Sequence, residues 1–89
     1  MITKERFMEI MKDDDSKTVF PKIDNALMGL NIIAKYIPAA GVSGANHDVI
    51  YSVSVEDIIN AGITEEDVLT LRRINWMIDE DWDSLACFV

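Results

Sequence analysis

Three aspartates occupy every second position around Trp82, in the segment WMIDEDWDSLACFV near the end of the chain. Carboxylates at the first, third and fifth positions of a loop are typical of a calcium site, where their oxygens converge on the ion. The sixth position of such a loop needs glycine but is Ser84 here, and alternating acids on an extended segment do not converge. We therefore expect no metal site, and interpret Asp79, Asp81 and Asp83 as part of a solvated hairpin turn or of an acidic docking surface.

His47 and Asp48 form a second candidate, because a histidine oriented by a carboxylate can act as a general base or a metal ligand. No nucleophile stands at a matching distance: Cys87 belongs to an apolar final segment, where an inert thiol is expected, and Ser52 and Ser54 are interpreted as outward residues of a strand. The sequence contains no glycine-rich phosphate loop, cysteine pair or two-histidine helix. We expect a local hydrogen-bonding role for His47 and Asp48, no cofactor and no enzymatic activity.

Two tryptophans flank the acidic turn, and each can be either a core residue or an exposed anchor for a protein partner. We expect Trp76 to belong to the core. For Trp82 the sequence leaves both interpretations open, and an exposed Trp82 beside carboxylates would favour a docking surface.

The net charge of −8 is distributed unevenly along the chain. Residues 1–36 carry six acids and six bases, whereas residues 37–89 carry ten acids and only Arg72 and Arg73 as bases. The second part would repel the phosphates of nucleic acids, so direct nucleic-acid binding is not expected. A basic surface on another protein would be attracted instead.

The length of 89 residues and the apolar share of 49% predict one globular domain over 1–89. The single cysteine indicates a reducing compartment, so we expect a cytoplasmic protein. The sequence has no signal-peptide pattern and no run of eighteen apolar residues, so neither secretion nor membrane association is expected.

Residues 1–37 show helical periodicity, with a first helix capped by Thr3 over about 3–12 and a second that begins within 18–21 and ends at Tyr36. The second helix is apolar over most of its circumference. Its expected inner face and the residues that widen this face are Ile23, Leu27, Leu30, Ala34 and Ile37, then Ala26, Met28, Ile32 and Ile33. Because a small sheet cannot cover so much apolar surface, we expect a homo-oligomer, most simply a dimer, formed through residues 21–36.

Residues 38–47 are rich in glycine and small residues and predict a flexible loop. Residues 48–89 then read as strand, helix, strand, strand. β-branched residues alternate from Val49 to Val55, Ser54 can cap a short helical turn, and Thr64 can cap a longer helix.

In the longer helix Val68, Leu71 and Ile74 should face inward, and Asn75 is a plausible left-handed stop. A hairpin of 76–78 and 84–89 should close the sheet, and a helical crossover between paired parallel strands would be right-handed. The sequence therefore predicts an α+β fold, with two N-terminal helices and a small β-α-β-β sheet unit.

Residues 47–89, from the HDVIY strand through the acidic helix to the closing SLACFV strand, resemble small acidic proteins encoded by phages and prophages. The resemblance implies an accessory protein that binds a host protein. It supplies no catalytic residue.

We expect a binding protein whose acidic second half docks on a basic surface of a host protein, where its carboxylates can take the places of nucleic-acid phosphates. The expected docking residues are Glu65, Glu66, Asp67, Asp79, Glu80, Asp81, Trp82 and Asp83. The alternative is a small-ligand binder or minor enzyme that uses a cleft near His47, Asp48 and Tyr51.

Overall fold

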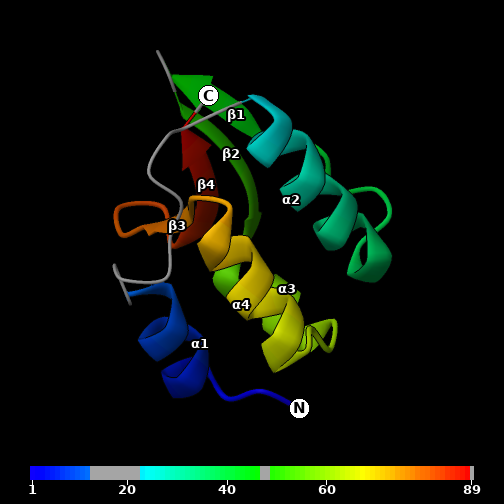
Figure 1. The fold of residues 1–89 in the computed structure, drawn as a ribbon, viewed down its shortest axis with the longest axis vertical. Coiled ribbons are helices and arrows are strands. Elements are labelled where there is room, and N and C mark those ends of the chain that lie inside the picture. The colour runs from blue at the N-terminus through cyan, green and yellow to red at the C-terminus, as the bar shows by residue number, and fades with distance from the viewer. Residues whose placement is uncertain (13–22, 47–48, 89) are drawn as a thin grey trace.

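The computed structural model describes residues 1–12, 23–46 and 49–88. In these residues four helices accompany a four-stranded antiparallel sheet, which confirms the predicted α+β class. The elements follow one another as α1 (Lys4–Met11), α2 (Ile23–Tyr36), β1 (Gly44–Asn46), β2 (Val49–Ser54), α3 (Val55–Asn60), α4 (Glu65–Arg73), β3 (Trp76–Asp79) and β4 (Ser84–Phe88), as Figure 1 shows. Within this described part, no helix is long and apolar enough to cross a membrane.

Three helices begin at the predicted hydroxyl caps. The side-chain oxygens of Thr3, Ser54 and Thr64 each accept a hydrogen bond, 3.1–3.2 Å long, from the backbone N–H three residues further on. Val55 is therefore the buried first residue of α3, although the alternation assigned it to the strand. Asn75 follows α4 with a φ of 67°, which confirms the predicted left-handed stop. The expected start of the second helix within 18–21, and the pair His47 and Asp48, lie outside the described residues.

The strands lie in the order β1-β2-β4-β3, and each neighbouring pair is antiparallel. The predicted hairpin is present as β3 and β4, but β4 lies between β2 and β3, so the two strands that the helices connect do not pair. The expected flexible loop over 38–47 also contains β1, whose residues pair with Val49 to Tyr51 of β2. Three small residues in succession have no hydrophobic alternation by which sequence analysis could detect this edge strand.

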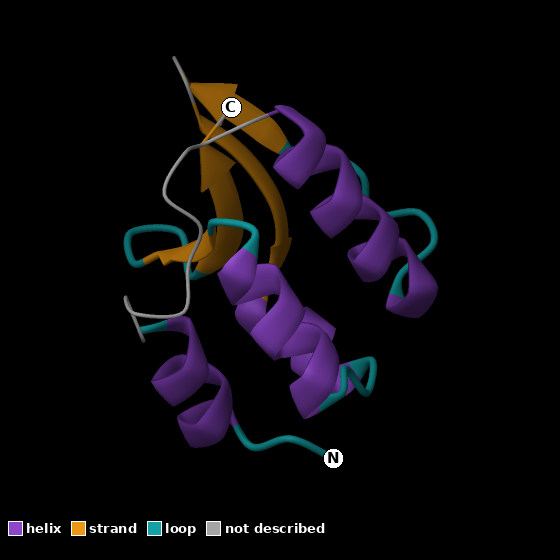
Figure 2. Ribbon diagram, viewed as in Figure 1, coloured by secondary structure: helices purple, strands orange, loops and turns teal. Residues whose placement is uncertain are grey.

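The helices pack against one face of the sheet, and α4 lies between α1 and α2 (Figures 1 and 2). The strands contribute Trp76, Leu85 and Cys87 to the core between sheet and helices. Because side chains alternate along a strand, Ser84 and Ala86 of β4 point to the other face of the sheet. This second face, away from the helix layer, is called the outer face below.

α2 buries a face different from the one that its apolar spacing predicts. Leu27 and Ala34, two of the predicted inward positions, are exposed, and the exposed fraction of Leu27 is 56%. Ala26 and Ile33, expected at the margin of the inner face, are buried, and the predicted inward residue Leu30 is half-buried against the core. The helix is therefore rotated about its axis relative to the prediction.

Trp76 explains this rotation and is fully buried, which confirms its predicted place in the core. Its indole Nε1 donates a 2.9 Å hydrogen bond to the carbonyl oxygen of Asn25 in the first turn of α2. One turn further along α2, a β-carbon on Gly29 would lie only 1.9 Å from the same nitrogen. The indole therefore packs directly on the α2 backbone, and this contact decides which side of α2 faces inward.

Candidate functional site

The turn between β3 and β4 presents Trp82 to solvent. The side-chain oxygen Oδ1 of Asp79 accepts hydrogen bonds from the backbone N–H groups of Asp81 (3.0 Å) and Trp82 (3.1 Å). Asp83 then adopts a left-handed φ of 49° and leads the chain into β4. Within this locally fixed turn the exposed fraction of Trp82 is 74%, so the choice left open by the sequence is decided in favour of an exposed indole.

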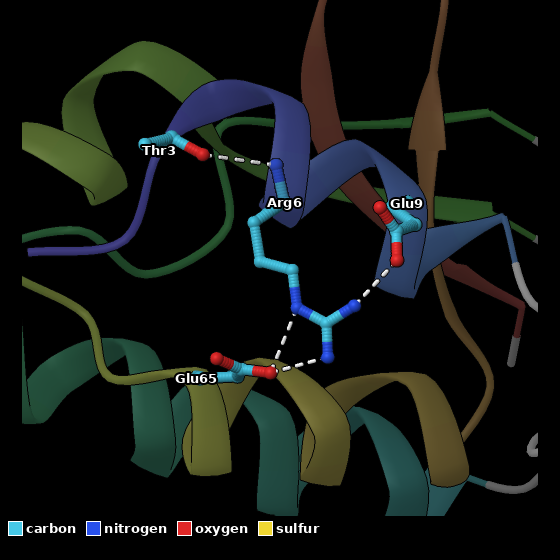
Figure 3. Close-up of polar contacts among 4 residues, drawn as sticks. All are labelled: Thr3, Arg6, Glu9 and Glu65. Atoms are coloured by element: carbon cyan, nitrogen blue, oxygen red, sulfur yellow. Dashed lines mark hydrogen bonds and ion pairs between the residues drawn. The ribbon is translucent and has the colours of Figure 1, made fainter.

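Basic residues of α1 form ion pairs with predicted docking acids both at the start of α4 and in the turn between β3 and β4. The guanidinium of Arg6 donates from Nε (2.8 Å) and Nη2 to Glu65 at the start of α4, and also pairs with Glu9 of its own helix (Figure 3). Lys4 pairs with Asp83 at 3.7 Å. Residues two apart on a helix project to different sides, so the acids of α4 and those of the turn lie on different sides of α1.

Asp67 connects α4 to α2 through polar contacts. It accepts a hydrogen bond from the Tyr36 hydroxyl and forms an ion pair of 2.9 Å with Lys35, and its side chain is only 17% exposed. The Tyr36 oxygen in turn accepts the backbone N–H of Thr64 at 3.3 Å. Burial alone would raise the pKa of Asp67, but the contacts with Tyr36 and Lys35 outweigh it and lower the pKa below its ordinary value. The Asp67 carboxylate thus links α4 to α2 through a hydrogen bond and an ion pair within the protein.

The predicted docking residues therefore fall into two groups. Glu65, Asp67 and Asp83 form ion pairs with α1 or α2, and Asp79 shapes the turn. The exposed side chains without an ion pair to any described residue are Glu66, Glu80, Asp81 and Trp82. Three of these four lie together in the turn.

A pocket of about 490 Å³ opens on the outer face of the sheet beside this turn. Two aromatic side chains line it, Tyr51 from β2 and Trp82 from the turn. The other lining residues are all small: Ser43, Gly44, Ala45, Ser52, Ser54 and Ser84. Small residues from β1, β2 and β4 thus leave room between two aromatic side chains, and a volume of this size suits a small molecule or an inserted side chain.

Of the four serines that line the pocket, one has a side-chain hydroxyl without a hydrogen-bond partner among the described residues. Ser43 donates to the carbonyl of Ser52 (2.8 Å), Ser52 donates to the carbonyl of Gly41 (2.7 Å), and Ser54 caps α3. Ser84 is only 8% exposed, and its hydroxyl bonds to no other atom in the described part of the chain. An unsatisfied buried hydroxyl costs about 1–3 kcal/mol, so an acceptor or donor supplied by a ligand would be stabilising.

The burial of Ser52 corrects its interpretation as an outward strand residue. The register between β2 and β4 shifts between Tyr51 and Ser54, which marks an irregularity of the bulge type. Such a bulge redirects side chains, so simple alternation cannot place Ser52. The pocket could not be predicted from the sequence because its residues come from three separate stretches, within 43–45, 51–54 and 82–84; of the expected cleft, Tyr51 is the described residue that lines it.

The remaining chemical candidates are limited. Burial raises the pKa of the Cys87 thiol to about 11, which keeps it protonated and unreactive in the folded protein. Among the described residues, no three His, Cys, Asp or Glu side chains are grouped so that they could hold a metal ion.

No known protein family, no curated protein and no solved structure matches the chain.

Proposed function

We propose that this protein is a small accessory protein that binds a host protein through the turn Asp79–Asp83 and the adjoining outer face of the sheet. The observation that carries the proposal is the exposure of Trp82 on a turn that Asp79 holds in place by two hydrogen bonds. A large aromatic side chain presented by an ordered turn resembles the tryptophan anchors that dominate the free energy of many protein interfaces.

The charge of this surface favours a basic partner. Glu80 and Asp81 directly precede Trp82 and form no ion pair with a described residue, and the whole chain carries a net charge of −8. Such charges act mainly on the association rate, which should fall as salt shortens the screening length from about 30 Å to about 8 Å. The surface for nucleic-acid mimicry is smaller than the sequence suggests, because Glu65, Asp67 and Asp83 are partly neutralised by ion pairs within the protein.

Capture from the natural host tests the proposal. The immobilised wild type, Trp82→Ala and the double variant Glu80→Gln/Asp81→Asn would be exposed to host lysate, and retained proteins identified by mass spectrometry. Met28→Ala is the matched control, because Met28 is also an exposed apolar residue but lies on α2, the expected dimer face, so that an effect of weakened self-association is distinguished from the loss of the turn. We expect one basic protein to be retained by the wild type and the control and lost with Trp82→Ala.

Measuring the association and dissociation rates of the captured protein then distinguishes the contribution of Trp82 from that of the neighbouring carboxylates. Trp82→Ala should raise the dissociation rate, by the tenfold or more expected for an anchor residue, whereas the double charge variant should lower the association rate and its dependence on salt. A retained protein that is lost with Met28→Ala, and not with Trp82→Ala, would contradict the proposed surface and point to α2.

The alternative function is the binding of a small molecule in the cleft beside Tyr51. The pocket between Tyr51 and Trp82 supports it. In that case no host protein would be retained in a Trp82-dependent manner. A small molecule would instead co-purify with the wild type from the host and be absent from purified Trp82→Ala.

A further inference from the structure

We propose that the pocket between Tyr51 and Trp82 receives an arginine side chain of the docking partner. This inference rests on the proposed binding function and names the chemistry of the partner's anchor. Three features of the pocket carry it: its two aromatic side chains, the unpartnered hydroxyl of Ser84, and the carboxylates of the adjoining turn.

The aromatic side chains suit a flat cation. A guanidinium group is planar and weakly hydrated, and it stacks on the faces of tryptophan and tyrosine rings. The other lining residues are small, so they leave space for a long side chain to lie across them. The volume of about 490 Å³ exceeds what a single arginine side chain fills, which leaves room for neighbouring backbone of the partner.

Ser84 offers the acceptor that a guanidinium requires. A guanidinium carries five N–H donors and no acceptor, so it must be met by oxygen atoms. The Ser43 and Ser52 hydroxyls already have backbone partners although their oxygens keep lone pairs, and the Ser54 oxygen already accepts a bond from α3, so a guanidinium bond to any of these three satisfies no unpaired group. The Ser84 hydroxyl is buried and unused, and meeting a guanidinium in the pocket requires that it change its χ1 rotamer.

Charge complementarity selects a cation over a neutral flat group. The turn that carries Trp82 also carries Glu80 and Asp81 as exposed acids, and Asp79 lies directly opposite Ser84 in the register of β3 and β4. Lysine would satisfy the charge but not the stacking, because its ammonium is compact and strongly hydrated. Arginine is the side chain that uses the rings, the hydroxyl and the carboxylates together.

Nuclear magnetic resonance titration tests this inference. The probes are blocked arginine (N-acetyl-arginine amide), the neutral isostere blocked citrulline, and blocked lysine, each added to the labelled protein at constant ionic strength. The indole N–H of Trp82 should shift with arginine, while that of Trp76, which is buried and bonded to Asn25, serves as the internal reference. We expect the dissociation constant to be at least about fivefold lower for arginine than for citrulline or lysine.

Three substitutions sharpen the test. Trp82→Ala should abolish the arginine-dependent shifts, which are then followed at the Tyr51 and Ser84 amides. Ser84→Ala should weaken arginine binding about fivefold, the value of one hydrogen bond. Ser43→Ala is the matched control, because Ser43 also lines the pocket but is exposed, so that a bond from its oxygen to a guanidinium would only replace one to water, and it should leave the affinity within twofold. An unchanged Trp76 indole signal confirms that each variant is folded.

Equal shifts with arginine and citrulline would overturn the inference in favour of a neutral planar ligand, and equal shifts with arginine and lysine would reduce the site to a plain charge attraction. An absence of shifts with all three probes would also overturn it. The proposed function fails separately: arginine could bind while no captured host protein depends on Trp82, and a Trp82-dependent host protein could be captured without any arginine effect.

Discussion

At the scale of single residues, the close contact between Gly29 and Trp76 allows a direct test of how the indole packs on the α2 backbone. A β-carbon at position 29 would lie 1.9 Å from Nε1 and 2.1 Å from Cε2 of the indole, so Gly29→Ala must displace either Trp76 or α2. Helix propensity alone would make this substitution stabilising by up to about 1 kcal/mol. We expect it to lower the free energy of unfolding by about 2 kcal/mol instead, as measured by urea denaturation, because overpacking outweighs propensity.

Asn31→Ala is the matched control for this measurement, since Asn31 is an exposed residue of the same helix. It should leave the stability unchanged or raise it slightly. A stabilising effect of Gly29→Ala would contradict the placement of the Trp76 indole on the α2 backbone, and with it the observed rotation of α2.

The contacts of Asp67 predict how stability depends on pH. Because the folded protein lowers the pKa of Asp67, the ionised carboxylate stabilises the fold at pH values above its ordinary pKa of about 4. This contribution disappears as the pH falls from there through the lower pKa of the folded state. We expect Asp67→Asn to destabilise the protein by about 1.5 kcal/mol at pH 7, and the difference from the wild type to shrink as the pH falls below the ordinary pKa and the carboxylate becomes protonated.

Denaturation of the wild type and Asp67→Asn at several pH values measures this difference directly, because the other acids titrate in both proteins. Glu66→Gln is the control, since Glu66 is exposed and forms no ion pair with a described residue. A difference between wild type and Asp67→Asn that stayed constant from pH 7 to pH 2 would show that the ionised carboxylate does not tie α4 to α2.

At the scale of elements, local chemistry in the sequence predicts most of the described architecture. Thr3, Ser54 and Thr64 each mark a helix start, because a hydroxyl that can satisfy a free N–H acts within three residues. Asn75 marks a helix end for a similarly local reason, its ability to adopt a positive φ. The caps, the stop and the hairpin were therefore within reach of sequence analysis.

The features that the sequence could not predict depend on contacts between distant residues. The apolar spacing of α2 is compatible with more than one inward face, and the choice between them is made by Trp76, about fifty positions away along the chain. The same is true of the candidate site. Trp82 could be named as an anchor, but the pocket beside it requires β1, the irregularity in β2 and the start of β4 to meet.

At the scale of the whole molecule, the fold redistributes the charge that is so uneven along the chain. Lys4 and Arg6 of α1 and Lys35 of α2 come from the electrically balanced first part, yet they pair with Asp83, Glu65 and Asp67 of the acidic second part. The local charge around α4 is therefore lower than the sequence implies. The turn around Trp82 keeps Glu80 and Asp81 as exposed acids without an ion pair to a described residue, so electrostatic attraction for a basic partner is retained where the exposed indole lies.

The expected dimer also belongs to this scale, and the described residues change how it should be tested. Leu27 and Met28 of α2 are 56% and 50% exposed, while Leu30 packs against the core. An acidic substitution of Leu30 would therefore disturb folding, whereas one at Leu27 or Met28 acts at the surface. The exposed side of α2 also includes Asn31 and Lys35, so its apolar stripe is narrower than the sequence suggests.

We propose that two copies associate through this exposed side of α2, which would remove Leu27 and Met28 from water. Sedimentation equilibrium of the wild type at micromolar concentration should give twice the chain mass of 10.0 kDa, and Leu27→Asp should give a folded monomer because two carboxylates would meet at the shared axis. Trp82→Ala is the control, since it removes an exposed apolar side chain from the turn and not from α2, and should therefore leave the dimer intact. A wild type that sediments only as a 10.0 kDa species would contradict the dimer, and the exposed residues of α2 would then be ordinary surface.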